Sequence, residues 1–141
     1  MPRIALLNMA LGFLAVFLAA CGGVFVANDA TNAFLHHPQE LQGWQFTLMA
    51  SAHGHTNLFG MLHILFGLTL PYSGFKGKTH VWQSVGLGLG TLGMSVLMVL
   101  RSFVMPSATS DPLGIVLGIM LGAALVAIGS HTAGLLQKLL R

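Results

Sequence analysis

The sequence contains very little charge. Only 6% of its 141 residues are Asp, Glu, Lys or Arg, whereas 55% are hydrophobic, and the mean hydropathy is +0.80. Soluble domains carry about 25% charged residues, so this composition excludes an ordinary water-soluble domain. The six Lys and Arg exceed the three acids. Because so few positive charges fit membrane topology better than a phosphate-binding surface, nucleic-acid binding is not expected.

Cysteine is almost absent. Cys21 stands alone, which excludes an internal disulfide and a multi-cysteine metal site. The residues Leu18-Ala19-Ala20-Cys21 follow an apolar run and look like a bacterial lipoprotein cleavage box, which would remove the first apolar segment. We expect this segment to be retained.

Groups suited to hydrolysis are also missing. No serine, cysteine or carboxylate is patterned as a nucleophile with its base, and the acids Asp29, Glu40 and Asp111 fall between the apolar stretches. The sequence therefore favours an electron-transfer protein, or a subunit of an oxidoreductase, over a stand-alone enzyme.

Four apolar stretches are long enough to cross a membrane, at residues 4–26, 44–70, 81–104 and 113–136. A hydrocarbon core about 30 Å thick needs about 20 such residues per helix. The sequence therefore predicts a single all-α domain over residues 1–141, an integral membrane four-helix bundle with up-down-up-down topology. The connecting loops are expected at 27–43, 71–80 and 105–112. The pair Asp111-Pro112 is typical of a helix start.

The charges divide between the two sides of this predicted bundle. The basic side carries Arg3, Lys76, Lys78, Lys138 and Arg141, and the other side carries the three acids. Basic residues favour the cytoplasmic side. We therefore predict a multi-pass protein of a bacterial-type cytoplasmic (inner) membrane, with both termini in the cytoplasm.

Glycines follow helical spacing in the last two stretches. They are Gly86, Gly88, Gly90 and Gly93 in the third and Gly114, Gly118 and Gly122 in the fourth. Small residues at such spacing let helix backbones approach closely. The pattern predicts helix packing, within the chain or between copies in a homo-oligomer or larger membrane complex, and clearance for a flat porphyrin is the alternative.

Seven histidines are present, and several fall inside the apolar stretches. His53, His55 and His63 lie in the second stretch and His131 in the fourth. Ionisable groups at membrane depth are costly and tend to mark function, and neutral imidazole is a common ligand of metals and of heme iron. The alternative is that each ring only forms hydrogen bonds with a neighbouring helix.

Helical geometry limits how these histidines can pair. At 100° per residue, His53 and His55 point about 160° apart, so they do not share one ion. His63 and His131 lie equally deep, about 28 Å below the outer ends of their helices, and are expected to face each other. His55 lies higher, and its candidate partners are His36 and His37 from the first loop, Met98, or a second copy of the chain. Arg101, near the outer side, either pairs with heme propionates or extends to the membrane surface.

The segment His55-Thr56-Asn57-Leu58, followed by an apolar run and Pro71, resembles the second transmembrane helix of the heme-copper oxidase and nitric oxide reductase large subunit. The resemblance covers about 20 residues and implies that His55 ligates a b-type heme; an Ala-His-Gly alignment would instead give this role to His53. The chain is too short for that subunit's full set of helices and lacks its paired histidines, so a small four-helix relative is implied.

Together these observations predict a membrane b-type cytochrome that holds one or two hemes between helices. His53, His55, His63 and His131 are the candidate ligands, Arg101 is a candidate heme contact, and His36 and His37 are further outer-side candidates. Quinone or a larger respiratory complex is the expected electron partner. Two alternatives remain open. One is a structural accessory subunit without cofactor, and the other is a membrane protein that handles copper or another metal.

Overall fold

The computed structural model describes residues 1–105 and 111–140, so the predicted loop at 105–112 falls mostly outside the described residues and Arg141 lies outside them altogether. The described part consists of helices and short turns. The elements are α1 (Arg3–His36), a 3₁₀ turn (Pro38–Gln42), α2 (Trp44–Thr69), a second 3₁₀ turn (Leu70–Tyr72), α3 (Lys78–Leu92), a π-helical segment (Gly93–Leu97), α4 (Met98–Ser102) and α5 (Pro112–Leu139). The prediction of an all-α fold is confirmed.

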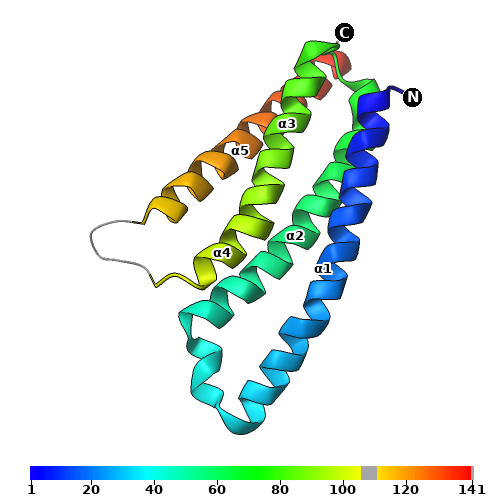
Figure 1. The fold of residues 1–141 in the computed structure, drawn as a ribbon. Coiled ribbons are helices and arrows are strands. Elements are labelled where there is room, and N and C mark those ends of the chain that lie inside the picture. Colours follow the sequence, from blue (N-terminus) through cyan, green and yellow to red (C-terminus); the bar gives the residue numbers. More distant parts are fainter. Residues whose placement is uncertain (106–110, 141) are drawn as a thin grey trace.

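Helix α3, the π-helical segment and α4 follow one another without a break, forming one helix from Lys78 to Ser102. The described chain therefore builds four long helices (Figure 1). The predicted starts of the second, third and fourth stretches agree with the observed helices within three residues. Asp111 caps α5 as expected, because its carboxylate accepts a 2.8 Å hydrogen bond from the Gly114 N–H.

The prediction of a loop at 27–43 is wrong over most of its length. Helix α1 continues to His36 and is 34 residues long, about 51 Å at 1.5 Å per residue. The polar residues after Val26 do not stop it because none of them is a proline or glycine, and Pro38 follows its end. The α1–α2 hairpin consequently extends beyond the turn after α4, as Figure 1 shows at its lower end.

Three of the described helices are long and apolar enough to cross a membrane, namely Arg3–His36, Lys78–Ser102 and Pro112–Leu139. Helix α2 has the length, at 26 residues, but His53, His55, Asn57 and His63 lower its hydropathy. It lies between α1 and the α3–α4 helix (Figure 1), and its His63 is 2% exposed. The start of α1 and the end of α5 lie at the same end of the bundle (Figure 1).

Small residues set the spacing of the helix pairs. Along the first half of α1 the buried positions alternate by three and four residues; they are Ala5, Asn8, Gly12, Ala15 and Ala19. A Cβ atom added to Gly12 would come 2.5 Å from the Gly60 carbonyl oxygen of α2. On the other side of the bundle, a Cβ at Gly86 would come 2.8 Å from the Ala123 carbonyl oxygen of α5. Both contacts bring helix backbones together.

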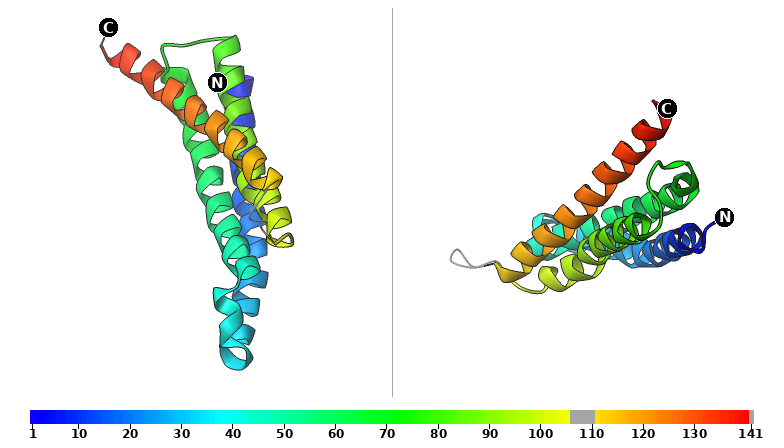
Figure 2. Two further views of the ribbon diagram at one scale, coloured as in Figure 1. Left: turned by 90° about the vertical axis from the view of Figure 1, so that its left-hand side faces the viewer. Right: turned by 90° about the horizontal axis from the view of Figure 1, so that it is seen from above.

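The predicted glycine faces have two different surroundings. Gly86, Gly90 and Gly93 pack on α5, which confirms packing within the chain for these three. Gly88 of α3 and Gly118 and Gly122 of α5 have nothing within 4 Å of an added Cβ, and the added Cβ at Gly114 meets its own cap, Asp111. Helix α5 crosses α3 at an angle (Figure 2), so only part of its length reaches the bundle.

The outer surface of the bundle is largely apolar. Phe13 and Phe17 of α1, Trp82 of α3, and Ile119 and Val126 of α5 are each at least 60% exposed. A surface of this kind is unfavourable in water and suits a hydrocarbon environment.

Candidate functional site

A long apolar groove of about 1110 Å³ runs between α1 and the α3–α4 helix, over one face of α2. Leu, Val, Ile, Ala and Phe side chains form most of its wall. The few polar groups that reach it include His53, Thr56 and His63 from α2 and Ser84, Thr91 and Ser95 from the opposite helix. Concave, mainly apolar sites with a few placed polar groups are typical of cofactor and ligand pockets.

His53 lies in this groove with one ring nitrogen bonded. Its Nδ1 is 3.0 Å from the Ala19 carbonyl oxygen, and a carbonyl oxygen only accepts, so Nδ1 carries the proton and Nε2 carries the lone pair. The ring also packs against Gly23, where an added Cβ would come 2.6 Å from Cε1. A histidine whose Nδ1–H donates to a backbone carbonyl presents Nε2 as a metal ligand in a fixed orientation.

His55 does not line the groove. Its Nδ1 lies 2.8 Å from the carbonyl oxygen of Ser51 one turn earlier in α2 and 3.2 Å from the Ser51 hydroxyl. These contacts are internal to the helix, and the ring is half-buried. The structure thus gives His53 and His55 different surroundings, in agreement with their predicted angular separation.

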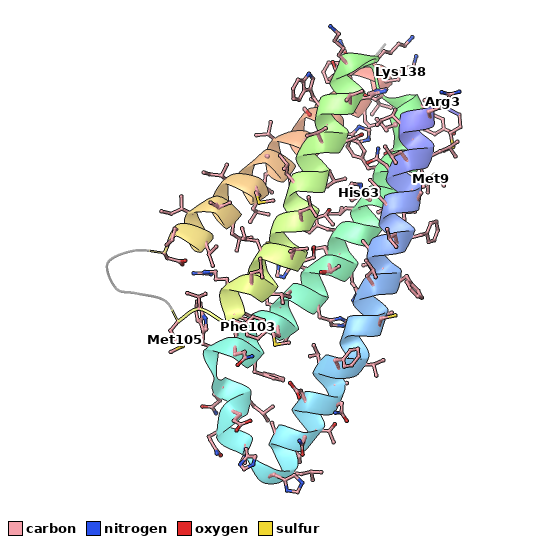
Figure 3. The ribbon with its side chains drawn as sticks, viewed as in Figure 1. Arg3, Met9, His63, Phe103, Met105 and Lys138 are labelled. Atoms are coloured by element: carbon pink, nitrogen blue, oxygen red, sulfur yellow. The ribbon has the colours of Figure 1, made fainter. Side chains whose placement is uncertain are left out.

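His63 is the centre of a buried polar network. It is 2% exposed, and its Nδ1 lies 2.9 Å from Asn8 Oδ1 while Nε2 lies 3.1 Å from Thr91 Oγ1. The Asn8 amide group donates to the Ile4 carbonyl at 2.8 Å and to the Ser84 hydroxyl at 2.7 Å. Asn8 Oδ1 must therefore accept from His63. Both ring nitrogens have partners, so the network joins α1, α2 and α3. Figure 3 labels His63 on α2.

His131 has a separate environment between α5 and the end of α2. Its Nε2 lies 2.8 Å from Thr69 Oγ1, and its ring centroid is 4.3 Å from that of Phe66. His63 and His131 therefore bond different partners, and the structure does not join them in the expected pair. His36 ends α1 and His37 follows it; both are exposed at the tip of the α1–α2 hairpin, away from His55.

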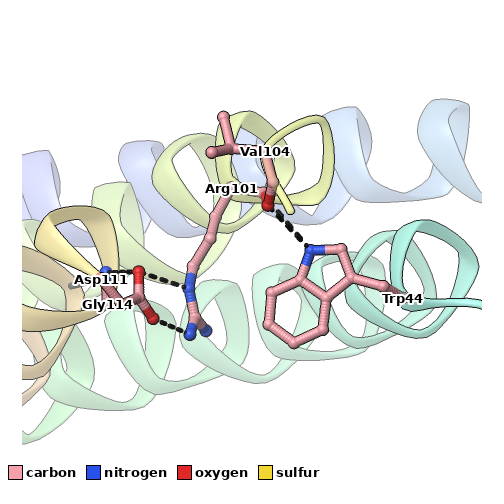
Figure 4. Close-up of polar contacts among 5 residues, drawn as sticks. All are labelled: Trp44, Arg101, Val104, Asp111 and Gly114. Atoms are coloured by element: carbon pink, nitrogen blue, oxygen red, sulfur yellow. Dashed lines mark hydrogen bonds and ion pairs between the residues drawn. The ribbon is translucent and has the colours of Figure 1, made fainter. Parts of the chain in front are cut away.

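Arg101 has partners within the protein. Its Nε donates to Asp111 Oδ1 at 3.3 Å, and its Nη2 forms an ion pair with Asp111 Oδ2. Its guanidinium carbon also lies 4.9 Å from the Trp44 ring centroid, and the Trp44 N–H donates to the Val104 carbonyl at 3.1 Å. Figure 4 shows this cluster, which connects the starts of α2 and α5 to the end of α4.

The same cluster alters one titration. The Arg101 guanidinium, and then the Gly114 backbone N–H, hold the pKa of the Asp111 carboxyl below its ordinary value of 3.8. Arg101 thus stabilises the charged form of the residue that caps α5, and its guanidinium is already engaged by a carboxylate.

Sequence reasoning missed three buried polar residues. Asn8 is 1% exposed, Gln83 3% and His80 7%. His80 was expected in the loop at 71–80, but α3 begins two residues earlier, at Lys78. The sequence does indicate that Asn8 is unusual, because it stands where the repeat from Ala5 to Ala19 otherwise has alanine or glycine. His80 and Gln83 are polar residues one turn apart in an otherwise apolar helix, and this spacing also indicates a polar contact on one helix face.

Within residues 1–105 and 111–140, no group of three or more His, Cys, Asp or Glu side chains is arranged to hold a metal ion. The described part of the chain is an all-helical bundle in which three helices are long and apolar enough to cross a membrane. Comparison with protein-family models, curated proteins and solved structures gives no match.

Proposed function

We propose that the chain is an integral membrane protein with four membrane-crossing helices in up-down-up-down order and with both termini in the cytoplasm. The apolar outer surface supports insertion, because exposed Leu, Phe and Val side chains are favourable in lipid and unfavourable in water. Helix α2, the most polar of the four, is partly shielded by α1 and the α3–α4 helix. Arg3 and Lys138 lie at the same end of the bundle (Figure 3), in keeping with a cytoplasmic basic side.

The function that the geometry supports best is binding of one b-type heme in the groove, with electron transfer as its use. The observation that carries this proposal is His53. It lies in an apolar groove of about 1110 Å³, and its Nδ1–H is held 3.0 Å from the Ala19 carbonyl. Nε2 is then left as a lone-pair donor, the arrangement expected of an axial heme ligand.

The groove fits a single axial ligand better than two. Its α3–α4 wall offers hydroxyls, among them Thr91 and Ser95, and aliphatic side chains, but no imidazole or thioether. A second ligand to the iron would have to come from outside this wall, for example from a second copy of the chain. His63 is excluded as a ligand in this arrangement because Asn8 and Thr91 use both of its nitrogens.

A bound heme would supply one-electron chemistry. The residues of this chain would set its position and surroundings. His53 would hold the iron, the Ala19 carbonyl would raise the basicity of that imidazole, and the aliphatic walls would exclude water. The open side of the groove would admit quinone or a larger respiratory complex as the electron partner.

Optical spectroscopy tests this proposal directly. We expect protein purified in detergent, or reconstituted with hemin, to show a reduced b-type Soret and alpha band with one heme per chain. His53→Ala should lose at least nine-tenths of this signal. The matched variant is His55→Ala, which removes an imidazole two residues away on the other face of α2 and should retain the heme.

Two outcomes would overturn the proposal. One is a colourless protein that does not take up hemin, and the other is an unchanged spectrum in the His53→Ala variant. Loss of heme in His55→Ala alone would transfer the role to the residue that the oxidase resemblance selects.

A structural accessory subunit is the second candidate function, and His63 favours it. An imidazole with both nitrogens bonded to neighbouring helices acts as a packing element, and the uncovered Gly118 and Gly122 of α5 would let another helix approach closely. The discriminating result is a folded, heme-free protein that co-purifies with other membrane subunits.

A further inference from the structure

The apolar groove continues to the end of the bundle where α1 and α3 begin. Its walls there include Ile4 of α1 and Val81 of α3. Along α1 the lining residues run from Ile4 to Val26, about 33 Å at 1.5 Å per residue. His53 contacts α1 at Ala19, about 22 Å along the helix from Ile4. The heme proposed above therefore lies in the far part of the groove, and the part near Ile4 is open to a different ligand.

One basic residue lies at this end of each wall. Arg3 is the first residue of α1 and Lys78 the first of α3, and both helices start at the same end of the bundle (Figure 1). The 2.7 Å hydrogen bond from the Asn8 amide to the Ser84 hydroxyl sets their register. Arg3 precedes Asn8 by about 8 Å along α1, and Lys78 precedes Ser84 by about 9 Å along α3. The two basic residues therefore lie at nearly the same height on opposite walls.

Both basic residues also share a helix face with residues that line the groove. Arg3 precedes Leu7 by one turn, which leaves them about 40° apart around α1, and Lys78 precedes Val85 by two turns, which leaves about 20°. Leu7 and Val85 line the groove. Arg3 and Lys78 are exposed, and long basic side chains can extend along the edge of an apolar surface. The two cations thus flank the mouth of the groove, which we call the basic mouth.

The acids of the chain lie away from the basic mouth. Asp111 forms an ion pair with Arg101, and Asp29 and Glu40 line a cavity beside the start of α2, at the other end of the bundle. The positive charge of the basic mouth is therefore not balanced by a carboxylate of the chain. An anionic group from outside the protein would complement it.

The groove below the basic mouth suits a hydrocarbon chain. Leu7, Leu11 and Val85 are among its aliphatic lining residues. Trp82, one turn after Lys78, is 72% exposed, and indole side chains are favoured at the level of the lipid headgroups. Two cations above an aliphatic groove match a molecule with an anionic head and an acyl chain. In a membrane, a molecule of this kind is an acidic phospholipid.

We propose that the basic mouth and the adjoining part of the groove bind one anionic phospholipid. Its phosphate would lie between Arg3 and Lys78, and an acyl chain would lie along Leu7 and Val85. The proposal rests on the membrane insertion proposed above. It does not depend on heme binding at His53, which lies farther along the groove.

Lipid binding can be measured by native mass spectrometry of the full, heme-free chain in a nonionic detergent. We expect one phosphatidylglycerol per chain, bound about tenfold more tightly than phosphatidylcholine, and Arg3→Gln and Lys78→Gln should each weaken its binding about fivefold. Lys138→Gln is the matched control, because it removes a charge at the same end of the bundle (Figure 3) from a residue that does not line the groove. Its binding should be unchanged.

A second pair of variants tests the groove without changing charge. Gly88 lines the groove, and nothing lies within 4 Å of an added Cβ. Gly88→Phe should therefore fill the groove without displacing a neighbouring helix, and it should weaken phosphatidylglycerol binding as strongly as Arg3→Gln does. Gly118 of α5 has equally open surroundings and lies outside the groove, so Gly118→Phe should bind the lipid normally. Circular dichroism checks that each variant is folded.

The proposal is overturned if phosphatidylglycerol binds no more tightly than phosphatidylcholine, or if Lys138→Gln weakens binding as much as Arg3→Gln. It is also overturned if inorganic phosphate displaces the lipid at constant ionic strength, because the cations would then serve a free anion. Flotation with phosphatidylcholine vesicles separates this failure from a failure of membrane insertion. A chain that floats without a preference for phosphatidylglycerol contradicts only the lipid site, whereas a chain that does not float contradicts insertion as well.

Discussion

The α1–α2 and α3–α5 interfaces both contain closely packed glycines and a buried histidine, but the two histidines differ in their hydrogen bonds. Each brings helix backbones together at glycine, Gly12 against Gly60 in one and Gly86 against Ala123 in the other. Each also buries a histidine. His63 has both nitrogens bonded, whereas His131 has only one. The comparison shows that the neighbours of a buried imidazole in an apolar helix decide whether both of its nitrogens are hydrogen-bonded.

The difference arises from the residues that face each ring. His63 lies next to Asn8, whose amide N–H groups donate to Ile4 and Ser84. The Asn8 Oδ1 atom is therefore left to accept from His63. His131 meets a threonine on one side and aromatic Phe66 on another. In the first interface both nitrogens of the imidazole have hydrogen-bonding partners, whereas in the second His131 Nδ1 has none among the described residues.

The largest effect is expected from overpacking the closer interface. Gly12→Ala places a Cβ 2.5 Å from a backbone oxygen of Gly60, and backbone atoms cannot move aside independently, so we expect a loss of about 3 kcal/mol in unfolding free energy. Gly118→Ala is the control, because nothing lies within 4 Å of its added Cβ. Denaturant unfolding followed by circular dichroism measures both. A loss of equal size in the control would contradict the packing described here.

The histidine comparison itself can be tested with volume-preserving substitutions. His63→Leu leaves Asn8 Oδ1 buried and unpaired, so we expect a loss of about 2 kcal/mol. His131→Leu strands no partner, because Thr69 keeps its bond to the Leu65 carbonyl, and it removes an unpaired nitrogen. Its unfolding free energy should stay within about 1 kcal/mol of the parent. Equal losses in the two variants would remove the distinction between the two interfaces.

The smallest effect concerns the end of α5 and depends on pH. The pKa of Asp111 is lower in the folded protein than its ordinary value of 3.8, so its stabilising contribution is fully present above about pH 4 and is lost as the pH falls through the folded-state pKa. We expect Asp111→Asn to lower the melting temperature slightly at pH 7, and we expect this difference to shrink as the pH falls below about 4. Added salt should reduce the difference at pH 7, since the pair is partly exposed. A difference that does not shrink as the pH is lowered would assign the effect to another cause.

Much of the fold could be predicted from the sequence because long apolar stretches and a Pro-containing cap are local features. The stretches beginning near Trp44, Val81 and Leu113 became helices within three residues of those starts, and Asp111 capped α5. The extension of α1 to His36 was missed because its last turns contain polar residues that are compatible with a helix.

The candidate sites were less predictable. His53 was identified as a candidate ligand, but its apolar groove is made by three helices. The pairing of His63 with His131 was expected from their equal depth, and the structure separates them because depth does not determine the angle around the helix axis. Asn8 and Gln83 form contacts with residues far along the chain: His63 and Ser84 lie 55 and 76 positions from Asn8, and Ser130 lies 47 positions from Gln83.

The sequence by itself determined that this chain is helical, strongly apolar and supplied with imidazoles at membrane depth, because composition and helical period are properties of each segment alone. Only the tertiary structure decided which imidazoles are fully bonded and which present a lone pair. The physical reason is that a hydrogen bond depends on what the neighbouring helix places within about 3 Å, and helix rotation and register are set by packing across the whole bundle.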